Sequence, residues 1–167
     1  MLSTIQLMYA YTQWADERMF TALTRLSDEQ WTRALGSSHT SIRDTAVHTI
    51  SAQWIWWSRW SGGGSPQHWK ADEFPTPKSL ETRWREHATN FQAFASAQTD
   101  ESLAKMLTIK NLRGEESTLQ LFGMMLHVAN HSTYHRGQTA TLLRQLGQVA
   151  EVTDLILYLR QAQASHS

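Results

Sequence analysis

The chain of 167 residues contains no cysteine, which excludes disulfide frameworks, thiolate metal sites and cysteine nucleophiles. Proline is scarce, and its three copies lie within residues 66–77, so long proline-free segments remain that favour helices. Basic and acidic residues number 15 each. This balance leaves no basic excess for binding a nucleic acid or for a polybasic membrane anchor.

Long hydrophobic runs are missing as well. No apolar stretch approaches the roughly 18 residues of a membrane span, and the N-terminal segment lacks the basic start and apolar block of a signal peptide. We therefore expect a cytoplasmic protein with neither a nucleic-acid nor a membrane partner. Histidine and tryptophan, in contrast, are abundant, with eight copies of each.

Apolar residues at spacings of three and four predict four long amphipathic helices, over residues 2–26, 41–60, 76–98 and 117–146. A short fifth helix is expected to begin at Thr153. Since each long helix has one apolar face, the four must pack together. The second and third connections are too long for tight hairpins. The predicted fold is all-α, a four-helix bundle with long crossover connections, in a single domain over residues 1–163 with a tail at 164–167.

Local signals predict some of the helix ends. Ser41 and Asp44 have the spacing of a capping box, with the Ser41 side chain on a first-turn amide and Asp44 favoured by the helix dipole. Ser117 and Gln120 repeat this pattern before the fourth long helix. The weak alternation of apolar residues at 105–119 favours a short hairpin or an irregular crossover.

Three histidines lie four residues apart in the fourth long helix: His127, His131 and His135. Side chains at this spacing are neighbours on one helix face, so two such imidazoles can bind one metal ion. His131 and His135 lie on the inward stripe, whereas His127 is rotated by about 80° from His135. Buried imidazoles without partners are costly, and this helix offers no acidic partner, so the pair favours a metal site.

A third ligand has to come from another element. His48 lies near the core side of the second long helix, and His87 lies near the apolar stripe of the third, so spacing does not distinguish them. The other histidines fall outside the helices, with His39 and His68 in loops and His166 in the tail.

Several polar residues border these positions. Asp44 precedes His48 by four residues and could orient its imidazole, although helix capping explains it more simply. Gln138 and Tyr134 lie within a turn of the histidine pair and are expected to border its pocket. Arg136 faces away from the inward stripe, so we expect it at the surface or in an ion pair, and we expect Asp16 to be a solvent or ion-pair residue near one bundle end.

Four segments of the chain resemble the DinB-like (DinB/YfiT) family of metal-binding four-helix bundles. They are YTQWADERMF, IRDTAVHTISAQWIWW, NHSTYHRGQTATLLRQLG and TDLILYLR, which together span nearly the whole chain. The resemblance implies one metal ligand in the second long helix and two, four apart, in the fourth, which here are His48, His131 and His135. It leaves His87 and His127 without a role. The family often has a proline before TDL, where this chain has QVAEV, so its last loop is expected to differ.

Tryptophans occupy nearly every face at the end of the second long helix, at Trp54, Trp56, Trp57 and Trp60. We expect them to supply both core and a partner surface. Because the family's bundles commonly dimerise, the resemblance implies a homodimer.

Three neutral imidazoles would leave a divalent ion, zinc or nickel, with an open coordination position. Such an ion activates water, polarises a carbonyl or ionises a thiol. Relatives with this triad include thiol-dependent transferases and isomerases, and without cysteine a thiolate would come from a low-molecular-weight cosubstrate. We therefore expect a metal-dependent thiol S-transferase or hydrolase acting on a small molecule, in a pocket with apolar and aromatic walls between the second and fourth long helices. The alternative is a non-catalytic metal-binding bundle that acts in a stress response or as an interaction module.

Overall fold

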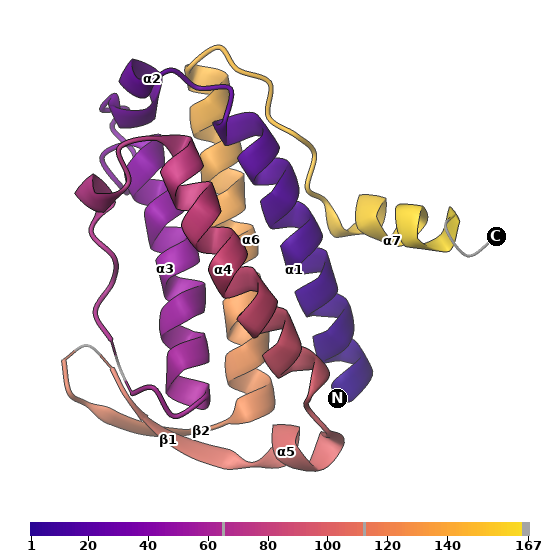
Figure 1. Cartoon of the computed structure of the whole chain (residues 1–167). Helices are drawn as coiled ribbons and strands as arrows, with labels where there is room; N and C mark the ends of the chain where they lie inside the picture. Colours follow the sequence, from indigo (N-terminus) through magenta and orange to yellow (C-terminus); the bar gives the residue numbers. More distant parts are fainter. Residues whose placement is uncertain (65, 112, 165–167) are drawn as a thin grey trace.

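The computed structural model describes residues 1–64, 66–111 and 113–164. Four long helices form its body: α1 (Leu2–Leu23), α3 (Ile42–Trp60), α4 (Pro77–Ser96) and α6 (Leu121–Gln145). In Figure 1, α1 and α6 run one way along the bundle, and α3 and α4 run the other way. α1 and α3 each pack against both α4 and α6. The fold is the predicted all-α four-helix bundle, with one small two-stranded sheet.

The shorter elements lie in the connections. α2 (Asp28–Thr32) joins α1 to α3, and the connection between α3 and α4 runs back along the bundle through the 3-10 turn η1 (Ala71–Glu73). α5 (Asp100–Ala104) and a hairpin lie at the opposite end (Figure 1). The hairpin consists of β1 (Met106–Lys110) and β2 (Glu116–Gln120), which pair antiparallel as the alternation at 105–119 predicted. α7 (Leu155–Ala164) follows α6, and residues 165–167, which include most of the predicted tail and His166, lie outside the described residues.

The helix starts confirm one predicted cap and correct another. Ser41 caps α3, because its Oγ accepts a hydrogen bond from the Asp44 amide at 3.1 Å and donates one to the Asp44 carboxylate at 2.7 Å. The predicted capping box of Ser117 and Gln120 is wrong. Both residues belong to β2, whose pairing with β1 keeps the backbone extended up to Gln120, and α6 begins at Leu121 without a side-chain cap.

The last helix also begins later than predicted. α7 starts at Leu155, and the carbonyl of Asp154 accepts hydrogen bonds from the Leu157 and Tyr158 amides. Thr153 lies two residues before this start, and its carbonyl accepts a hydrogen bond from the Tyr11 hydroxyl of α1 at 2.8 Å. This contact fixes the segment before α7 against α1.

The core is divided along the bundle into two hydrophobic clusters. One contains Phe20, Trp31 and Trp84, and the other contains Tyr9, Phe91 and Met125. Between them, α1, α3 and α6 contribute buried polar side chains instead of apolar ones. The candidate site lies at the level of this polar layer. Within the described residues, the structure contains no helix with the length and apolar character needed to cross a membrane.

Candidate metal centre

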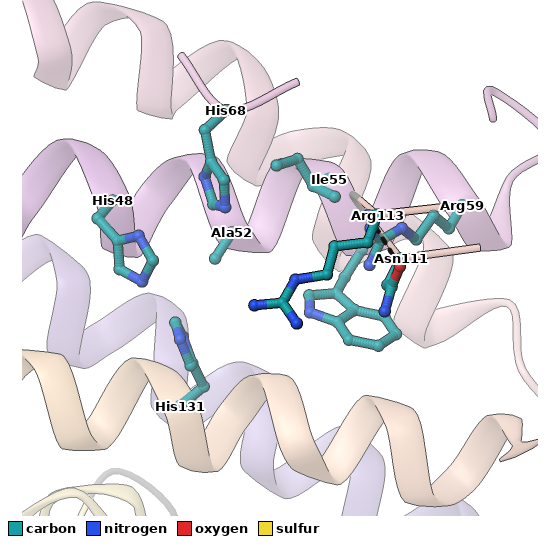
Figure 2. Close-up of a pocket in the computed structure, with 9 residues that line it drawn as sticks. His48, Ala52, Ile55, Arg59, His68, Asn111, Arg113 and His131 are labelled. Atoms are coloured by element: carbon teal, nitrogen blue, oxygen red, sulfur yellow. Dashed lines mark hydrogen bonds between the residues drawn. The ribbon is translucent and has the colours of Figure 1, made fainter. Parts of the chain in front are cut away.

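Three histidines from two helices meet between α3 and α6. The ring centroids of His131 and His135 are 4.3 Å apart, as expected for neighbours four residues apart on α6. The His48 ring of α3 lies 5.3 Å from that of His131 and 4.6 Å from that of His135. Figure 2 shows His48 and His131 pointing toward each other from the two facing helices. The predicted triad is therefore close together in space.

Two loop histidines that the sequence analysis left aside join this group. The His39 ring lies 4.5 Å from the His48 ring, and the His68 ring stacks on His48 at 5.1 Å. The ligand nitrogens of His39, His48 and His135 all lie within 4.8 Å of one another, so these three imidazoles could hold one ion, with His39 in the place that the prediction gave to His131. His48 and His135 are common to both sets.

Backbone and hydroxyl contacts position the two loop histidines. The loop that carries His39 is closed by a hydrogen bond from the Leu35 amide to the Thr40 carbonyl at 3.0 Å, immediately before the Ser41 cap of α3. His68 lies in the connection after α3, where its Nδ1 is 3.0 Å from the Ser51 hydroxyl. Ser51 Oγ also accepts a hydrogen bond from the Trp69 amide. Both loops are thus tied to α3 near His48.

The environment favours the neutral form of four of these imidazoles, those of His48, His68, His131 and His135. Burial, which is the larger cause, and the neighbouring imidazoles together lower the pKa of His48 to about 3 and that of His131 to about 4. Burial also lowers the pKa of His68 and His135. Neutral imidazole is the form that binds a metal. The cluster is therefore ready to accept a cation near pH 7 without first releasing protons.

Gln138 sets the orientation of His135. Its Nε2 donates to the Ser38 hydroxyl at 3.4 Å, which turns Oε1 toward His135 Nδ1 at 2.7 Å. With the proton on Nδ1, the Nε2 lone pair of His135 is available, and this atom lies 3.1 Å from Nε2 of His131. Two nitrogens bound to one tetrahedral ion at roughly 2.0–2.1 Å are about 3.3 Å apart, so this pair of donors fits such an ion.

The remaining predicted site residues have other surroundings. His87 is buried between Trp57 and Phe91, away from the cluster. The His127 ring packs edge-on against Trp56, with its centroid 5.6 Å from that of His131. The Asp44 carboxylate is bound by its own cap residue, in agreement with the capping interpretation.

Tyr134 lies at the edge of the cluster. Its side chain is exposed, and its ring packs edge-on against His135 with a centroid distance of 5.1 Å. It borders His135 from the outside and is not among the residues that line the cavity described below.

A buried ion pair lies beside the histidines, on a neighbouring face of α6. Arg136 donates to Asp16 at 2.8 Å, and both side chains are 1% exposed. Gln53 of α3 donates to the second Asp16 oxygen and to Ser132. The expectation of Asp16 as a solvent or ion-pair residue at a bundle end is thus corrected: it is an ion-pair residue in the interior, because α1 presents it to α3 and α6 in the polar layer.

A cavity of about 330 Å³ opens beside the histidines, between α3 and α6 as predicted. Its walls include apolar and aromatic side chains, but also two arginines that the sequence analysis did not place there. They are Arg59, from the last turn of α3, and Arg113, from the hairpin turn. Figure 2 shows Arg113 extending toward the histidines.

The tryptophan-rich end of α3 is covered in large part by other elements of the chain. Trp54 packs with Trp69 of the α3–α4 connection, and Trp60 stacks on Phe94 of α4. Trp57 packs edge-on against His87 of α4. Much of the aromatic surface assigned to a partner is therefore accounted for within one chain, and the homodimer stays a prediction.

The fold and the histidine cluster together define a helical bundle with a three-imidazole site that could hold a metal ion. The family model of the DinB family matches residues 1–166, so the chain belongs to the DinB family. It is similar to the protein named Protein DinB from Bacillus subtilis (strain 168), with 28% identity over 162 residues that cover 91% of each chain.

A solved structure has a similar fold. The crystal structure of a DinB-like protein from Bacillus cereus ATCC 10987 superposes with a TM-score of 0.66, at 22% identity, over 84% of this chain and 91% of that chain. At this level of identity the likeness supports the fold alone.

Proposed function

We propose that the chain binds one divalent transition metal ion, zinc or nickel, through His48, His131 and His135. The observation that supports this is the convergence of neutral imidazole nitrogens from α3 and α6, with the Nε2 atoms of His131 and His135 3.1 Å apart. Imidazole suits both metals. Gln138 would hold His135 in the ligating tautomer.

We further propose that the site is that of a metal-dependent enzyme acting on a small molecule, either a thiol S-transferase or a hydrolase. An ion with three neutral ligands supplies a Lewis acid that lowers the pKa of a bound water or thiol. The chain itself contributes a cavity that opens on His48 and His131, with Trp56 in its wall. With no cysteine in the chain, a thiol would have to come from a cosubstrate.

Metal analysis of single-histidine variants tests the ligand assignment. The purified protein should contain about one ion per chain, and His131→Ala and His135→Ala should lose it. His87→Ala is a matched control, because His87 is also a buried helical histidine but lies away from the cluster. Unchanged metal content in His131→Ala would contradict the assignment.

The position of His39 favours a second candidate function, a metal-binding bundle without catalysis. Its ligand nitrogen lies within 4.8 Å of those of His48 and His135, so it could complete a closed set of four imidazoles. In that case both His39→Ala and His131→Ala would weaken metal binding, and no thiol or water would exchange at the ion. For the enzyme we expect His39→Ala to retain the metal.

Thermal shift with small thiols separates the two enzyme classes. For a transferase, a thiol should raise the melting temperature of metal-loaded protein and leave chelated protein unchanged. For a hydrolase, thiols should have no effect, and hydrolysis of a model ester or amide should be abolished in His135→Ala. Absence of both responses would leave the metal-binding bundle without catalysis as the remaining candidate function.

A further inference from the structure

His68 is a histidine of the cluster to which the proposed metal site gives no role. Its ring stacks on that of His48, with the centroids 5.1 Å apart and the planes inclined by 25°. It lines the same cavity as His48 and His131, and Figure 2 shows the three rings directed toward the space between α3 and α6. His68 belongs neither to the proposed triad nor to the set of ligand nitrogens that includes His39. It therefore lies beside the candidate ion position without being one of its ligands.

The buried hydroxyl of Ser51 shows which nitrogen of His68 carries the proton. Ser51 is 0% exposed, and its Oγ accepts a hydrogen bond from the Trp69 amide at 2.9 Å. Because that amide can only donate, the hydroxyl proton needs an acceptor of its own. The hydroxyls of Thr45 and Thr49 on the same helix donate to a carbonyl one turn back. Within the described residues Ser51 has no such carbonyl, and the acceptor in reach is His68 Nδ1 at 3.0 Å.

The opposite assignment would leave a buried donor unsatisfied. If Nδ1 carried the proton and donated it to Ser51, the Ser51 hydroxyl proton would have no acceptor in an interior position, which is costly. The neutral ring therefore has its Nδ1 lone pair engaged by Ser51 and its proton on Nε2. This is the reverse of His135, where Gln138 faces Nδ1 and leaves the Nε2 lone pair available. His135 is thus prepared to bind a cation, and His68 is prepared to donate a hydrogen bond.

The residue after His68 holds it in position. The Trp69 ring packs against Trp54 of α3 at 5.3 Å and against Phe74 at 5.7 Å, and the Arg83 guanidinium carbon lies 5.4 Å from its centroid. With its amide on Ser51, Trp69 is anchored by both its backbone and its side chain. The imidazole of His68 is therefore oriented before any ligand arrives, and a donor fixed in advance stabilises developing negative charge without reorganising.

We propose that His68 donates a hydrogen bond from Nε2 to the ligand atom that occupies the open coordination position of the ion, and that Ser51 positions it for this task. This inference rests on the proposed metal-dependent function. An oxygen atom has two lone pairs, so an oxygen of the ligand can bind the ion with one and accept from His68 with the other. The site would therefore favour a substrate that presents a carbonyl or similar oxygen to the ion.

The tautomer of His68 can be measured without metal. Long-range ¹H–¹⁵N correlation spectra of ¹⁵N-labelled, metal-free protein at pH 7.5 should show a neutral His68 ring with its proton on Nε2. The signals are assigned by their absence from the spectrum of His68→Gln. A proton on Nδ1, or on both nitrogens, would overturn the inference.

Two probes of zinc-loaded protein test the donor itself by calorimetry. Acetohydroxamate offers oxygen atoms, whereas free imidazole uses its one lone pair on the ion and keeps no acceptor. We expect His68→Phe to weaken acetohydroxamate binding by about tenfold and to leave imidazole binding unchanged. His68→Gln, whose side-chain amide can donate, should recover part of the lost affinity. The zinc content of both variants should remain about one ion per chain.

Ser51→Ala tests the positioning role. It should weaken acetohydroxamate binding by about threefold, again with unchanged zinc content and unchanged imidazole binding. Thr49→Ala is the matched control, because its hydroxyl is equally buried on α3 but donates to the Thr45 carbonyl, and it should bind acetohydroxamate like the wild-type protein.

Three results would overturn the inference in distinguishable ways. Loss of zinc from His68→Phe would make His68 a metal ligand. Equal weakening of acetohydroxamate and imidazole would show that His68 only maintains the shape of the cavity. Wild-type protein that takes up no zinc would overturn the proposed function, and this inference with it.

Discussion

The two polar regions on neighbouring faces of α6 are built in contrasting ways. On one face, Arg136 and Asp16 neutralise each other, and Gln53 donates one hydrogen bond to the second carboxylate oxygen and another to Ser132. On the other face, one residue earlier in each case, His131 and His135 meet further imidazoles. The ion pair is closed within the chain. The histidine cluster instead brings together neutral electron-pair donors, so the comparison separates a region that stabilises the fold from one that could bind a cation.

Breaking the ion pair should have the largest effect on stability. Asp16→Ala leaves the Arg136 guanidinium buried without its counter-charge, and we expect the free energy of unfolding to fall by about 3–5 kcal/mol. Urea denaturation of metal-free protein measures this loss, with the exposed Asp72→Ala as the control. His135→Ala, measured in the same way, should change stability much less. A loss in His135→Ala as large as that in Asp16→Ala would remove the distinction between the two regions.

Acidic pH should destabilise the fold through His87, which is a buried histidine outside the cluster. Burial lowers the pKa of His87 to about 4, while in the unfolded chain it is about 6.5. The contribution of His87 to the free energy of unfolding is therefore fully present above pH 6.5. It declines as the pH falls toward 4, since only the unfolded chain takes up the proton. The maximum loss from this residue is about 3 kcal/mol.

The variant that isolates this contribution is His87→Leu. Comparing urea denaturation at pH 7.5 and pH 4.5, the metal-free variant should lose less stability on acidification than the wild-type protein. An identical pH dependence in the two proteins would mean that His87 does not remain neutral in the fold.

The smallest expected effect concerns the orientation of His135 in the histidine cluster. Gln138→Leu removes the acceptor for His135 Nδ1, which lies 2.7 Å from it. We expect metal affinity to fall by about 10–100-fold while the fold is retained. Competition with a chromogenic chelator measures the affinity, and Gln145→Leu, at the exposed end of α6, serves as the control. Equal affinities in the two variants would show that Gln138 does not orient the ligand.

Prediction from the sequence succeeded where the information was local. The four long helices follow from apolar periodicity, and the proximity of His131 and His135 follows from their spacing on one helix. Ser41 was found because its hydrogen bond closes within a single turn. The capping pattern at Ser117 failed because strand pairing with β1 competes for the same residues.

What the sequence could not predict depends on how separate segments meet. His39 and His68 approach His48 only through the course of two loops, and neither loop has a motif that specifies it. Asp16 and Arg136 pair across 120 positions of sequence. A weak signal existed for His39, because it stands two residues before the cap of α3 and is therefore tied to the helix that carries His48.

The hairpin that carries Arg113 is closed at its base, where the Leu121 amide donates to the Lys105 carbonyl at 3.0 Å. Residues 106–120 therefore form a hairpin whose two ends are already held together by this hydrogen bond. The length of the hairpin can change with little entropic cost to the bundle. Doubling a loop costs only about 0.6 kcal/mol in closure entropy. Adding two residues to each strand would move the tip by about 7 Å. The reach of the turn into the cavity is thus adjustable in discrete steps that leave the spacing of the helices unaltered.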